Sequence, residues 1–493
     1  MLFRSDRWMV SQFAIYTSDG TQWELVAVSQ TGDPTGAWYR YAFQFTWMPD
    51  YPKFGIWSDG YYLSVNQFEK VGSTYNWKGG GACVLNRSKM LAGDPSAEMV
   101  FFNLGVSYGG LLPADIDGDL PPAGTPGYFA RISSNSLQMW SLTANWNNPQ
   151  ASSLLPLPAI PVASFSNQGI NVTQPATTQT LASIADRLMY RLQYRNVGDF
   201  QALVTNHTVN NGAGQAAVRW YELRKTGANW TLYQQGTYAP ADGNSRWMAS
   251  AAMNASGDIA LGYSVSGNAT YPSIRYTGRN ANDAPGTMTW EETSIFEGSN
   301  SQNNLNRWGD YSCMAVDPSN DEDFWFTSEY TTGGWSWRTR IASFSPVPAP
   351  LPQIMVSTEL LEFGNVVPGN PAVKSFIIQN TGNAQLVVND VTCSHPDFLV
   401  SPASLIVEPG GQFEIFVDFF PSSAGFKEGL ITIFSNDPVY PELSINVSGT
   451  GILPAPENLQ ALVNDHDVSL TWEPAQVSSK GFLGYLIFRQ GSQ

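Results

Sequence analysis

Four arginines recur at equivalent points of a repeated pattern, and each precedes a large apolar residue that opens a strand-like run. They are Arg7, Arg187, Arg246 and Arg307. A guanidinium group can grip a carboxylate through two parallel hydrogen bonds. If the four converge together with Lys53, they would form a pocket for a sialic or uronic acid. A second interpretation stays open, because each arginine follows an Asp, Ser or Asn and could tie neighbouring repeats together through ion pairs.

Aromatic residues lie at the same points of the repeat. They are Trp8, Tyr51, Trp247, Trp308 and Tyr311. Their rings could stack on the apolar C–H faces of sugars, so we predict that Tyr51, Trp247, Trp308 and Tyr311 bind a ligand together with the basic residues. Packing in a core is the alternative role of a tryptophan.

Carboxyl groups in these segments could support glycoside hydrolysis, which needs two of them about 5 Å or 6.5–9.5 Å apart. Asp50 and Asp310 are the first candidate pair, and Glu329 is the substitute. A single Asp at the start of a strand can equally serve as a turn or cap residue. No G-x-S-x-G motif is present, and His207 is the single histidine before residue 345, so a nucleophilic triad is not indicated.

An acidic stretch carries Asp115, Asp117 and Asp119 at alternate positions, with Gly118 between the last two. Alternate carboxylates can converge on a hard cation, so a structural calcium site is one interpretation and a solvated acidic turn is the other. Pro126 stands where an EF-hand loop would need Glu. No cofactor is required by the pattern. Three cysteines lie far apart without C-x-x-C spacing, which indicates neither a zinc site nor a disulfide framework.

The elements that must position these residues are strands. Six units begin near residues 6, 50, 125, 186, 245 and 306, about 45–75 residues apart, as expected for four-stranded sheets with long loops. Helical periodicity is nearly absent, with a short candidate around 180–187. We therefore predict an all-β fold, a β-propeller with six recognisable blades in which the first strand of each blade lines a central channel.

Composition limits the partners. The chain has 493 residues, 43% of them hydrophobic and 13% charged, with a net charge of −16. Such a charge argues against nucleic acid or an anionic membrane, and no run of 18 apolar residues is present. The 17 tryptophans and the low charge favour a rigid secreted or cell-surface protein, although the sequence as given shows no signal peptide. Oligomeric state is not indicated.

The composition and strand pattern of the sequence change along the chain and divide it into regions. We predict a propeller over 1–345, a Pro-rich linker over 346–352, an immunoglobulin-like sandwich over 353–452 and a partial domain over 453–493. The third region resembles the abnormal-spindle/hydin type of Ig-like domain. The matching phrases are Leu361 to Gly369, Asn380 to Gly382, Phe420 to Gly425, Ser435 to Pro438 and Val447 to Gly451. This resemblance implies a spacer or assembly role, commonly in secreted or surface proteins of bacteria.

The last region resembles the first half of a fibronectin type III domain. Strand A would open at Pro456, strand B would carry Trp472, and strand C would run over 484–489. Such a domain needs two closed sheets, so we expect this piece to be marginal by itself.

The first region resembles sialidase-like or BNR-like propellers of large secreted bacterial proteins. The matching phrases are Asp6 to Ala14, Asp33 to Tyr41, Asp50 to Gly55 and Arg307 to Tyr311. The resemblance implies a seven-bladed ring in the full-length protein, with one more repeat ahead of the first. Ser18 to Trp23 only approximates the S-x-D-x-G-x-x-W box of true sialidases.

Two functions from different classes follow. The first is an extracellular protein whose propeller binds a glycan or another surface polymer at the central channel, displayed on Ig-like spacers. The second is a sialidase-like glycoside hydrolase or lyase that acts on an acidic sugar. A purely architectural role carries no residue signal of its own.

Overall fold

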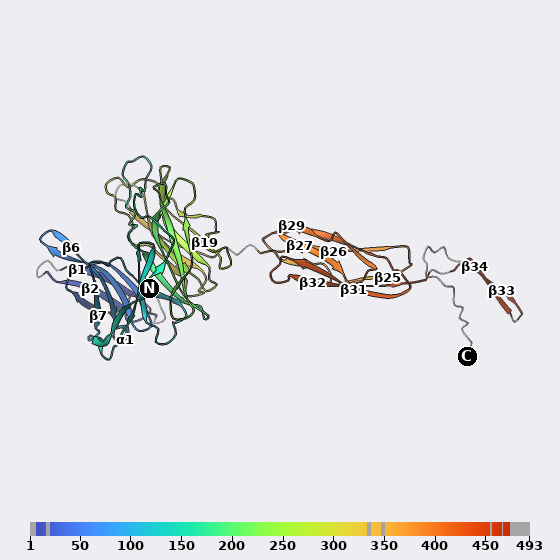
Figure 1. Cartoon of the computed structure of the whole chain (residues 1–493), viewed down its shortest axis with the longest axis horizontal. Coiled ribbons are helices and arrows are strands. Elements are labelled where there is room, and N and C mark those ends of the chain that lie inside the picture. Colours follow the sequence, from blue (N-terminus) through green and yellow to red (C-terminus); the bar gives the residue numbers. More distant parts are fainter. Residues whose placement is uncertain are drawn as a thin grey trace. The chain divides into compact units, whose positions relative to one another are not determined.

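The computed structural model describes residues 6–15, 20–332, 337–346, 351–453, 456–465 and 467–473. The chain forms two compact units, Met1–Pro348 and Ala349–Gln493, and strands account for nearly all of their regular structure (Figure 1). The prediction of an all-β protein is confirmed. No helix in the described part of the chain is long and apolar enough to cross a membrane.

Six strand groups follow one another in the N-terminal unit, and each group is an antiparallel meander. Group 1 contains β1 (Met9–Ile15), β2 (Gln22–Ser29) and β3 (Trp38–Phe45). Group 2 contains β4 (Met48–Ile56), β5 (Tyr61–Val71), β6 (Thr74–Leu85) and β7 (Met99–Gly105). Group 3 contains β8 (Leu112–Gly118), β9 (Gly127–Ser133), β10 (Ser136–Thr143), β11 (Ser153–Pro156) and β12 (Ile160–Pro161).

The other three groups repeat this order. Group 4 contains β13 (Met189–Asn196), β14 (Gln201–Asn210), β15 (Ala216–Lys225) and β16 (Thr231–Tyr238). Group 5 contains β17 (Ser245–Met253), β18 (Ile259–Gly267), β19 (Thr270–Arg279) and β20 (Thr293–Phe296). Group 6 contains β21 (Cys313–Val316), β22 (Phe324–Thr331) and β23 (Trp337–Phe344).

The first strands of successive groups contact one another in chain order, from β1 through β4, β8, β13 and β17 to β21. Two of them, β8 and β13, also pair in parallel, and this pairing joins groups 3 and 4 into one nine-stranded sheet. Separate blades were expected at this point. A closed ring is not seen among the described strands, so the propeller itself stays a prediction.

Apolar layers fill the spaces between neighbouring groups. One layer joins Val26 and Val28 of group 1 to Leu63 and Cys83 of group 2, and another joins groups 4 and 5 through Trp220 and Leu261, among others. Strand alternation explains both layers, because residues two apart point to the same face. Each group therefore buries at least one face against its neighbour in the chain.

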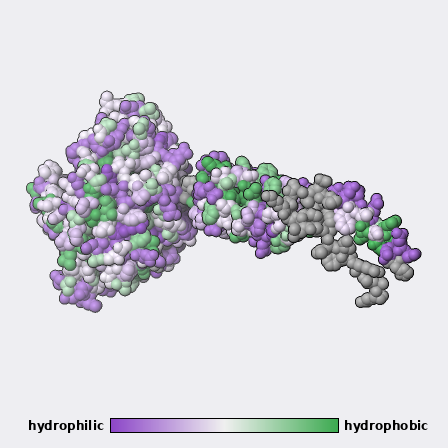
Figure 2. All heavy atoms as spheres, turned by 45° about the vertical axis from the view of Figure 1, so that its right-hand side comes forward, coloured by the Kyte–Doolittle hydropathy of each residue, from purple (hydrophilic) through white to green (hydrophobic). Residues whose placement is uncertain are grey.

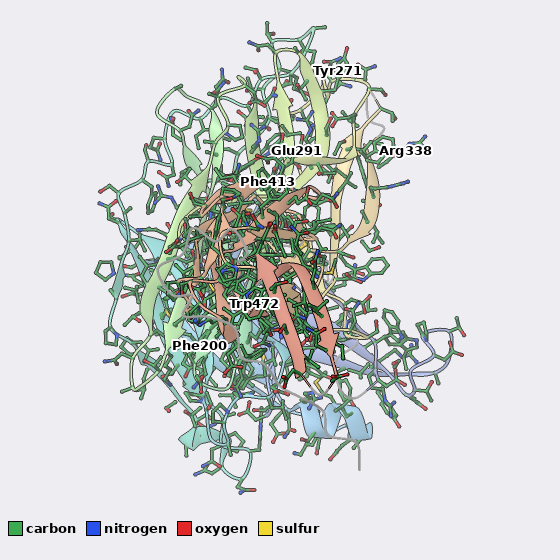
Figure 3. All side chains as sticks on the ribbon, turned by 90° about the vertical axis from the view of Figure 1, so that its right-hand side faces the viewer. Phe200, Tyr271, Glu291, Arg338, Phe413 and Trp472 are labelled. Carbon is green, nitrogen blue, oxygen red and sulfur yellow. The ribbon has the colours of Figure 1, made fainter. Side chains whose placement is uncertain are left out.

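Groups 1 and 6 each leave a second face largely uncovered. In group 6, Trp325, Trp337 and Ile341 are 42%, 61% and 66% exposed. In group 1, Val10 is 59% exposed. Arg338 of β23 points outward, away from the sheets (Figure 3). Apolar and polar residues lie intermingled on the visible surface of this unit (Figure 2).

One short α-helix, α1 (Arg87–Ala92), and one 3-10 helix, η1 (Pro149–Ala151), interrupt the strands of the described chain. The side chain of Asn86 caps α1 by accepting a hydrogen bond from the Lys89 N–H, and Gly93 ends it at φ +74°. Asn before a helix and Gly after it are the residues that these two positions favour. The predicted helical stretch at 180–187 is irregular instead.

The C-terminal unit contains a two-sheet sandwich. One sheet is formed by β24 (Ile354–Val356), β26 (Ala372–Asn380), β30 (Gln412–Phe419) and β28 (Phe398–Ser401). The other is formed by β25 (Leu360–Val366), β32 (Glu442–Gly451), β31 (Gly425–Ser435), β27 (Leu386–Cys393) and β29 (Leu405–Val407). Their inward residues, such as Phe376, Ile415 and Ile431, form a single core. The predicted immunoglobulin-like domain is confirmed.

The predicted fibronectin-like piece is described only in part. The hairpin of β33 (Glu457–Asn464) and β34 (Asp467–Glu473) matches the expected strands A and B. Its apolar residues Leu459, Leu462 and Val468 are all more than half exposed. Strand C, expected over 484–489, and most of the predicted Pro-rich linker lie outside the described residues.

Candidate functional site

Three segments far apart in the sequence meet around the amino group of Lys53. The Lys53 Nζ lies 3.8 Å from the ring centre of Tyr51 and 3.3 Å from that of Tyr311, and the two rings are 5.6 Å apart. The Arg187 guanidinium lies 4.8 Å from the Tyr51 ring centre. We name Tyr51, Lys53, Arg187, Asp310 and Tyr311 the Lys53 cluster. It brings together predicted ligand-binding residues from groups 2, 4 and 6.

A bulge in β4 aims the first two of these side chains. The register between β4 and β5 shifts between Asp50 and Lys53, and Tyr51 has a φ of +57°. A left-handed conformation is unfavourable for a residue with a large side chain, and bulges often re-aim side chains at functional sites. The bulge and the left-handed backbone at Tyr51 therefore set the position of its ring in the cluster.

Burial controls the electrostatics of the cluster. Lys53 is 2% exposed, and burial lowers its pKa well below the usual range, while nearby Asp310 acts in the opposite direction. The Lys53 Nζ and the Tyr51 hydroxyl donate to the Asp310 carbonyl oxygen at 3.5 Å and 3.4 Å. The rings of Tyr51 and Tyr311 thus pack against the Lys53 amino group and take the place that a carboxylate usually has beside a buried lysine.

The three candidate acids lie at or beside this cluster. Burial raises the pKa of Asp50. Burial also raises the pKa of Glu329, and the nearby negative charge of Asp310 raises it further. The Glu329 Oε1 accepts a hydrogen bond from the Gly309 N–H at 2.7 Å. Burial also raises the pKa of Tyr311 to about 12. Acids of this kind hold their proton to higher pH, which general-acid chemistry requires.

Arg187 and Arg307, the two repeat arginines at or beside the cluster, are already bound by carboxylates. Asp186 holds Arg187 through two hydrogen bonds of 3.0 Å and 2.9 Å, and Asp310 holds Arg307 at 2.5 Å. These acids belong to the same segments as their arginines. The charges of the cluster are therefore nearly balanced, which disfavours an anionic ligand.

Other predicted residues lie elsewhere. Arg246 binds Asp242 and Glu292 of its own group, and Arg7 donates to the Asp6 carbonyl oxygen. Trp247 and Trp308 are buried, at 0% and 2% exposure, with their ring centres 6.0 Å apart. Both indoles pack in the core and have no surface on which a sugar could stack.

The acidic stretch forms a strand rather than a solvated turn. Asp115 and Asp117 project from β8 toward Arg191 of β13, which binds them at 3.0 Å and 2.5 Å. Asp119 follows the strand and makes an isolated bridge with Asn196. The guanidinium lies between the two carboxylates, where a cation would have to bind. No group of three or more His, Cys, Asp or Glu side chains suited to a metal occurs in the described residues.

Sequence reasoning missed the residues that join the groups. Gln193 donates to Asp117 and to the Met253 carbonyl oxygen, and Arg195 binds Asp321 through two hydrogen bonds. Arg191, Gln193 and Arg195 alternate along β13, so they share one face of that strand. Asp115 and Asp117 have the same alternate spacing. This match between the acidic and the basic stretch could have predicted that β8 and β13 lie side by side.

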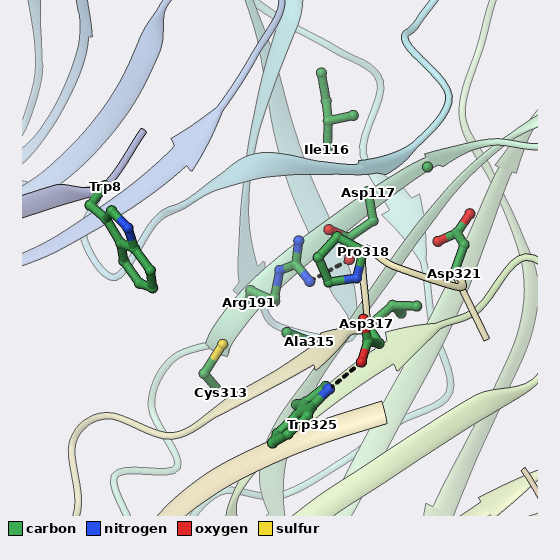
Figure 4. Close-up of a pocket in the computed structure, with 12 residues that line it drawn as sticks. Trp8, Ile116, Asp117, Arg191, Cys313, Ala315, Asp317, Pro318, Asp321 and Trp325 are labelled. Carbon is green, nitrogen blue, oxygen red and sulfur yellow. Dashed lines mark hydrogen bonds and ion pairs between the residues drawn. The ribbon is translucent and has the colours of Figure 1, made fainter. Parts of the chain in front are cut away.

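A pocket of about 550 Å³ is lined by Trp8, by residues of β8 and group 6, and by Arg191, which lies among them (Figure 4). Trp8 and Trp325 line it, together with Cys313. Burial raises the pKa of Cys313 to about 11, which keeps the thiol protonated and poorly nucleophilic. All three cysteines are free.

Comparisons with known proteins identify one part of the chain. Residues 352–450 match the family described as HYDIN/CFA65/VesB-like, Ig-like domain. This match supports the predicted resemblance to the hydin type for that region. The curated proteins give no match to the chain.

Solved structures give distant likenesses. The PapD-like domain 7 of human CEP192 is 15% identical over 22% of this chain and 92% of that chain, with a TM-score of 0.20. A protein of unknown function from Dyadobacter fermentans is 11% identical over 76% of this chain and 95% of that chain, with a TM-score of 0.30. The Bombyx mori GH32 beta-fructofuranosidase BmSUC1 is 9% identical over 83% of this chain and 87% of that chain, with a TM-score of 0.26.

Proposed function

We propose that the N-terminal unit binds a carbohydrate on the Lys53 cluster. The observation that carries this proposal is the meeting of two tyrosines and two basic side chains from groups 2, 4 and 6. Lys53 and Tyr51 are buried, at 2% and 7% exposure, so Tyr311 and Arg187 supply the surface that a ligand would contact. Tyr311 is 58% exposed, and the side chain of the neighbouring Arg307 is 66% exposed. An exposed ring beside hydrogen-bonding groups suits a sugar, which has apolar C–H faces and polar hydroxyls.

The frame that we propose for this site is a β-propeller of the sialidase-like or BNR-like kind. Support comes from the consecutive contacts of the six first strands and from the uncovered faces of groups 1 and 6. A seventh blade between those two groups would cover both faces and close the ring. The aromatic-rich, weakly charged composition and the Ig-like domain support a secreted or cell-surface location.

Hydrolysis of a glycoside is the second candidate function. The raised pKa values of Asp50 and Glu329 beside the cluster favour it, because a glycosidase needs one acid that stays protonated. The sialidase-like version, with an acidic substrate, receives less support because carboxylates already occupy Arg187 and Arg307. Binding without cleavage is therefore the function that we propose. Release of reducing sugar from a bound glycan, lost in Glu329→Gln, would favour the enzyme instead.

Replacing Tyr311 with alanine is expected to weaken glycan binding by about tenfold, because a stacked ring contributes roughly 1 kcal/mol beyond the area that it buries. A glycan array probed with the full chain would identify the ligand, and calorimetry would give the affinity of both proteins. Tyr440, which is 52% exposed on the Ig-like domain, offers the matched control Tyr440→Ala. Equal affinity of the Tyr311 variant and the wild type would contradict the proposed site.

A further inference from the structure

Two neighbouring hollows extend from the Lys53 cluster over groups 2 and 3. Their volumes are about 430 Å³ and 460 Å³, and both are lined by Arg131 and Asp186. The first hollow is also lined by Arg187, whose guanidinium lies over the Tyr51 ring. We name the two hollows together the Trp77 groove. Arg187 therefore belongs to both the groove and the cluster.

The indole of Trp77 is held rigidly although it is 38% exposed. Its Nε1 donates to the Val106 carbonyl oxygen at 2.8 Å, and the Phe68 ring contacts it edge-on with centres 5.3 Å apart. A Cβ atom on Gly109 would lie 2.5 Å from the indole, so glycine is needed at this position. A fixed, exposed aromatic face is organised in advance for a flat apolar ligand surface.

Polar groups along the groove are similarly fixed. Arg131 donates to the carbonyl oxygens of Ser107 and Ile132 at 2.9 Å and 3.0 Å, and its guanidinium lies 5.6 Å from the Tyr108 ring centre. Asn135 and Asn167 line the second hollow beside Phe165. Amides, a guanidinium and aromatic rings provide donors, acceptors and stacking faces, which is the chemistry of a polyhydroxylated ligand.

The charges along this surface nearly cancel. Arg131, Arg187, Lys53 and Arg307 stand against Asp186, Asp310, Asp50 and Glu329. Burial favours the neutral forms of Lys53, Asp50 and Glu329. These three groups therefore add little to the net charge of the surface. The arrangement thus offers little net attraction for a polyanion.

We propose that the Trp77 groove holds consecutive units of a neutral, unbranched polysaccharide that continues onto the Lys53 cluster. This inference rests on the proposed function and adds the class of ligand and the direction in which it lies. Each hollow falls in the size range of small-ligand sites, so several sugar units fit along the surface. A ligand too short to reach the groove makes contact with the cluster alone.

The test uses an array of neutral oligosaccharides (cello-, malto-, xylo- and manno-series) and acidic ones (oligogalacturonates and hyaluronan fragments), each at two and six units. The full chain is expected to bind one neutral series at least tenfold more tightly at six units than at two. Trp77→Ala should remove this gain without changing the affinity for two units. Tyr311→Ala should weaken binding at both lengths.

Two further variants guard against unfolding and non-specific effects. Gly109→Ala keeps the indole but displaces it, because the added Cβ would clash with the ring, so we expect the same loss at six units. Trp337→Ala removes an indole that is 61% exposed on β23 and should change nothing. Circular dichroism confirms that each variant is folded.

The outcomes separate the two proposals. Preference for an acidic series, affinity independent of length, or full affinity of folded Trp77→Ala at six units would overturn the neutral-polymer inference and leave the Lys53 cluster as a binding site. Failure of every glycan to bind would overturn both.

Discussion

Replacing Arg191 with methionine is expected to lower the free energy of unfolding of the N-terminal unit by about 3–5 kcal/mol, the cost of leaving a buried charge without its partner. The Arg191 side chain is 3% exposed and that of Asp115 is 1% exposed. The guanidinium binds Asp115 and Asp117 together. Without it, the Asp115 carboxylate remains in the core and can respond only by taking up a proton or admitting water.

Denaturant unfolding followed by tryptophan fluorescence measures this change selectively, because every tryptophan except Trp472 lies before residue 349. The control is Lys78→Met, which breaks the exposed ion pair with Glu69 and should cost less than about 1 kcal/mol. The double variant Arg191→Met with Asp115→Asn should recover part of the loss. Equal stability of Arg191→Met and Lys78→Met would show that the buried pair does not hold the groups together.

Replacing Glu24 with glutamine is expected to stabilise the N-terminal unit at pH 8 by a few kcal/mol. Glu24 is 0% exposed on β2, and burial raises its pKa from 4.5 to about 8, with a smaller opposing effect of Ser11. The folded protein therefore keeps this proton in a pH range where the unfolded chain has lost it. Stability should fall as pH rises from about 4.5 to about 8, at up to 1.4 kcal/mol per pH unit.

The measurement is the free energy of unfolding of both proteins at pH 5 and at pH 8. The advantage of Glu24→Gln should be small at pH 5 and large at pH 8, since glutamine cannot ionise. Glu291→Gln, at an exposed position of the same unit, controls for the general effect of removing a negative charge. An advantage that does not depend on pH would refute the explanation by burial.

Much of the fold could be predicted because its local signals agree. Period-two alternation between turn residues indicates strands, and the Ig-like domain carries a complete set of phrases from Leu361 to Gly451. The third group was placed too late in the sequence, since its first strand, β8, contains the acidic residues that we interpreted as a calcium site or an acidic turn. The unusually long interval between the second and third predicted units indicated that the start of the third unit had been misplaced. A buried strand that carries Asp at alternate positions contradicts ordinary strand propensity, and tertiary contacts with Arg191, Gln193 and the Ile56 N–H stabilise it.

The repeat predicted part of the candidate site. Equivalent positions in groups 2, 4 and 6 do converge, which brings Tyr51, Lys53, Arg187 and Tyr311 together. The same reasoning could not separate rings that face a surface from rings in the core, and Trp247 and Trp308 belong to the core. It could not find Trp77 either, because this residue lies on a β-hairpin outside the repeated motif. Exposure depends on neighbours that a single sequence does not reveal.

The parallel seam between β8 and β13 has a consequence for how the molecule opens. Strand pairing joins one strand group to the next only there among the described strands of the N-terminal unit, and the Arg191 ion pairs reinforce the same seam. Groups 3 and 4 should consequently exchange their amide hydrogens as a single cooperative block, at the slowest rate in the unit. Groups 1 and 6, each supported on one side, should open first, so that thermal fluctuations begin at the two flanks and reach the nine-stranded sheet last.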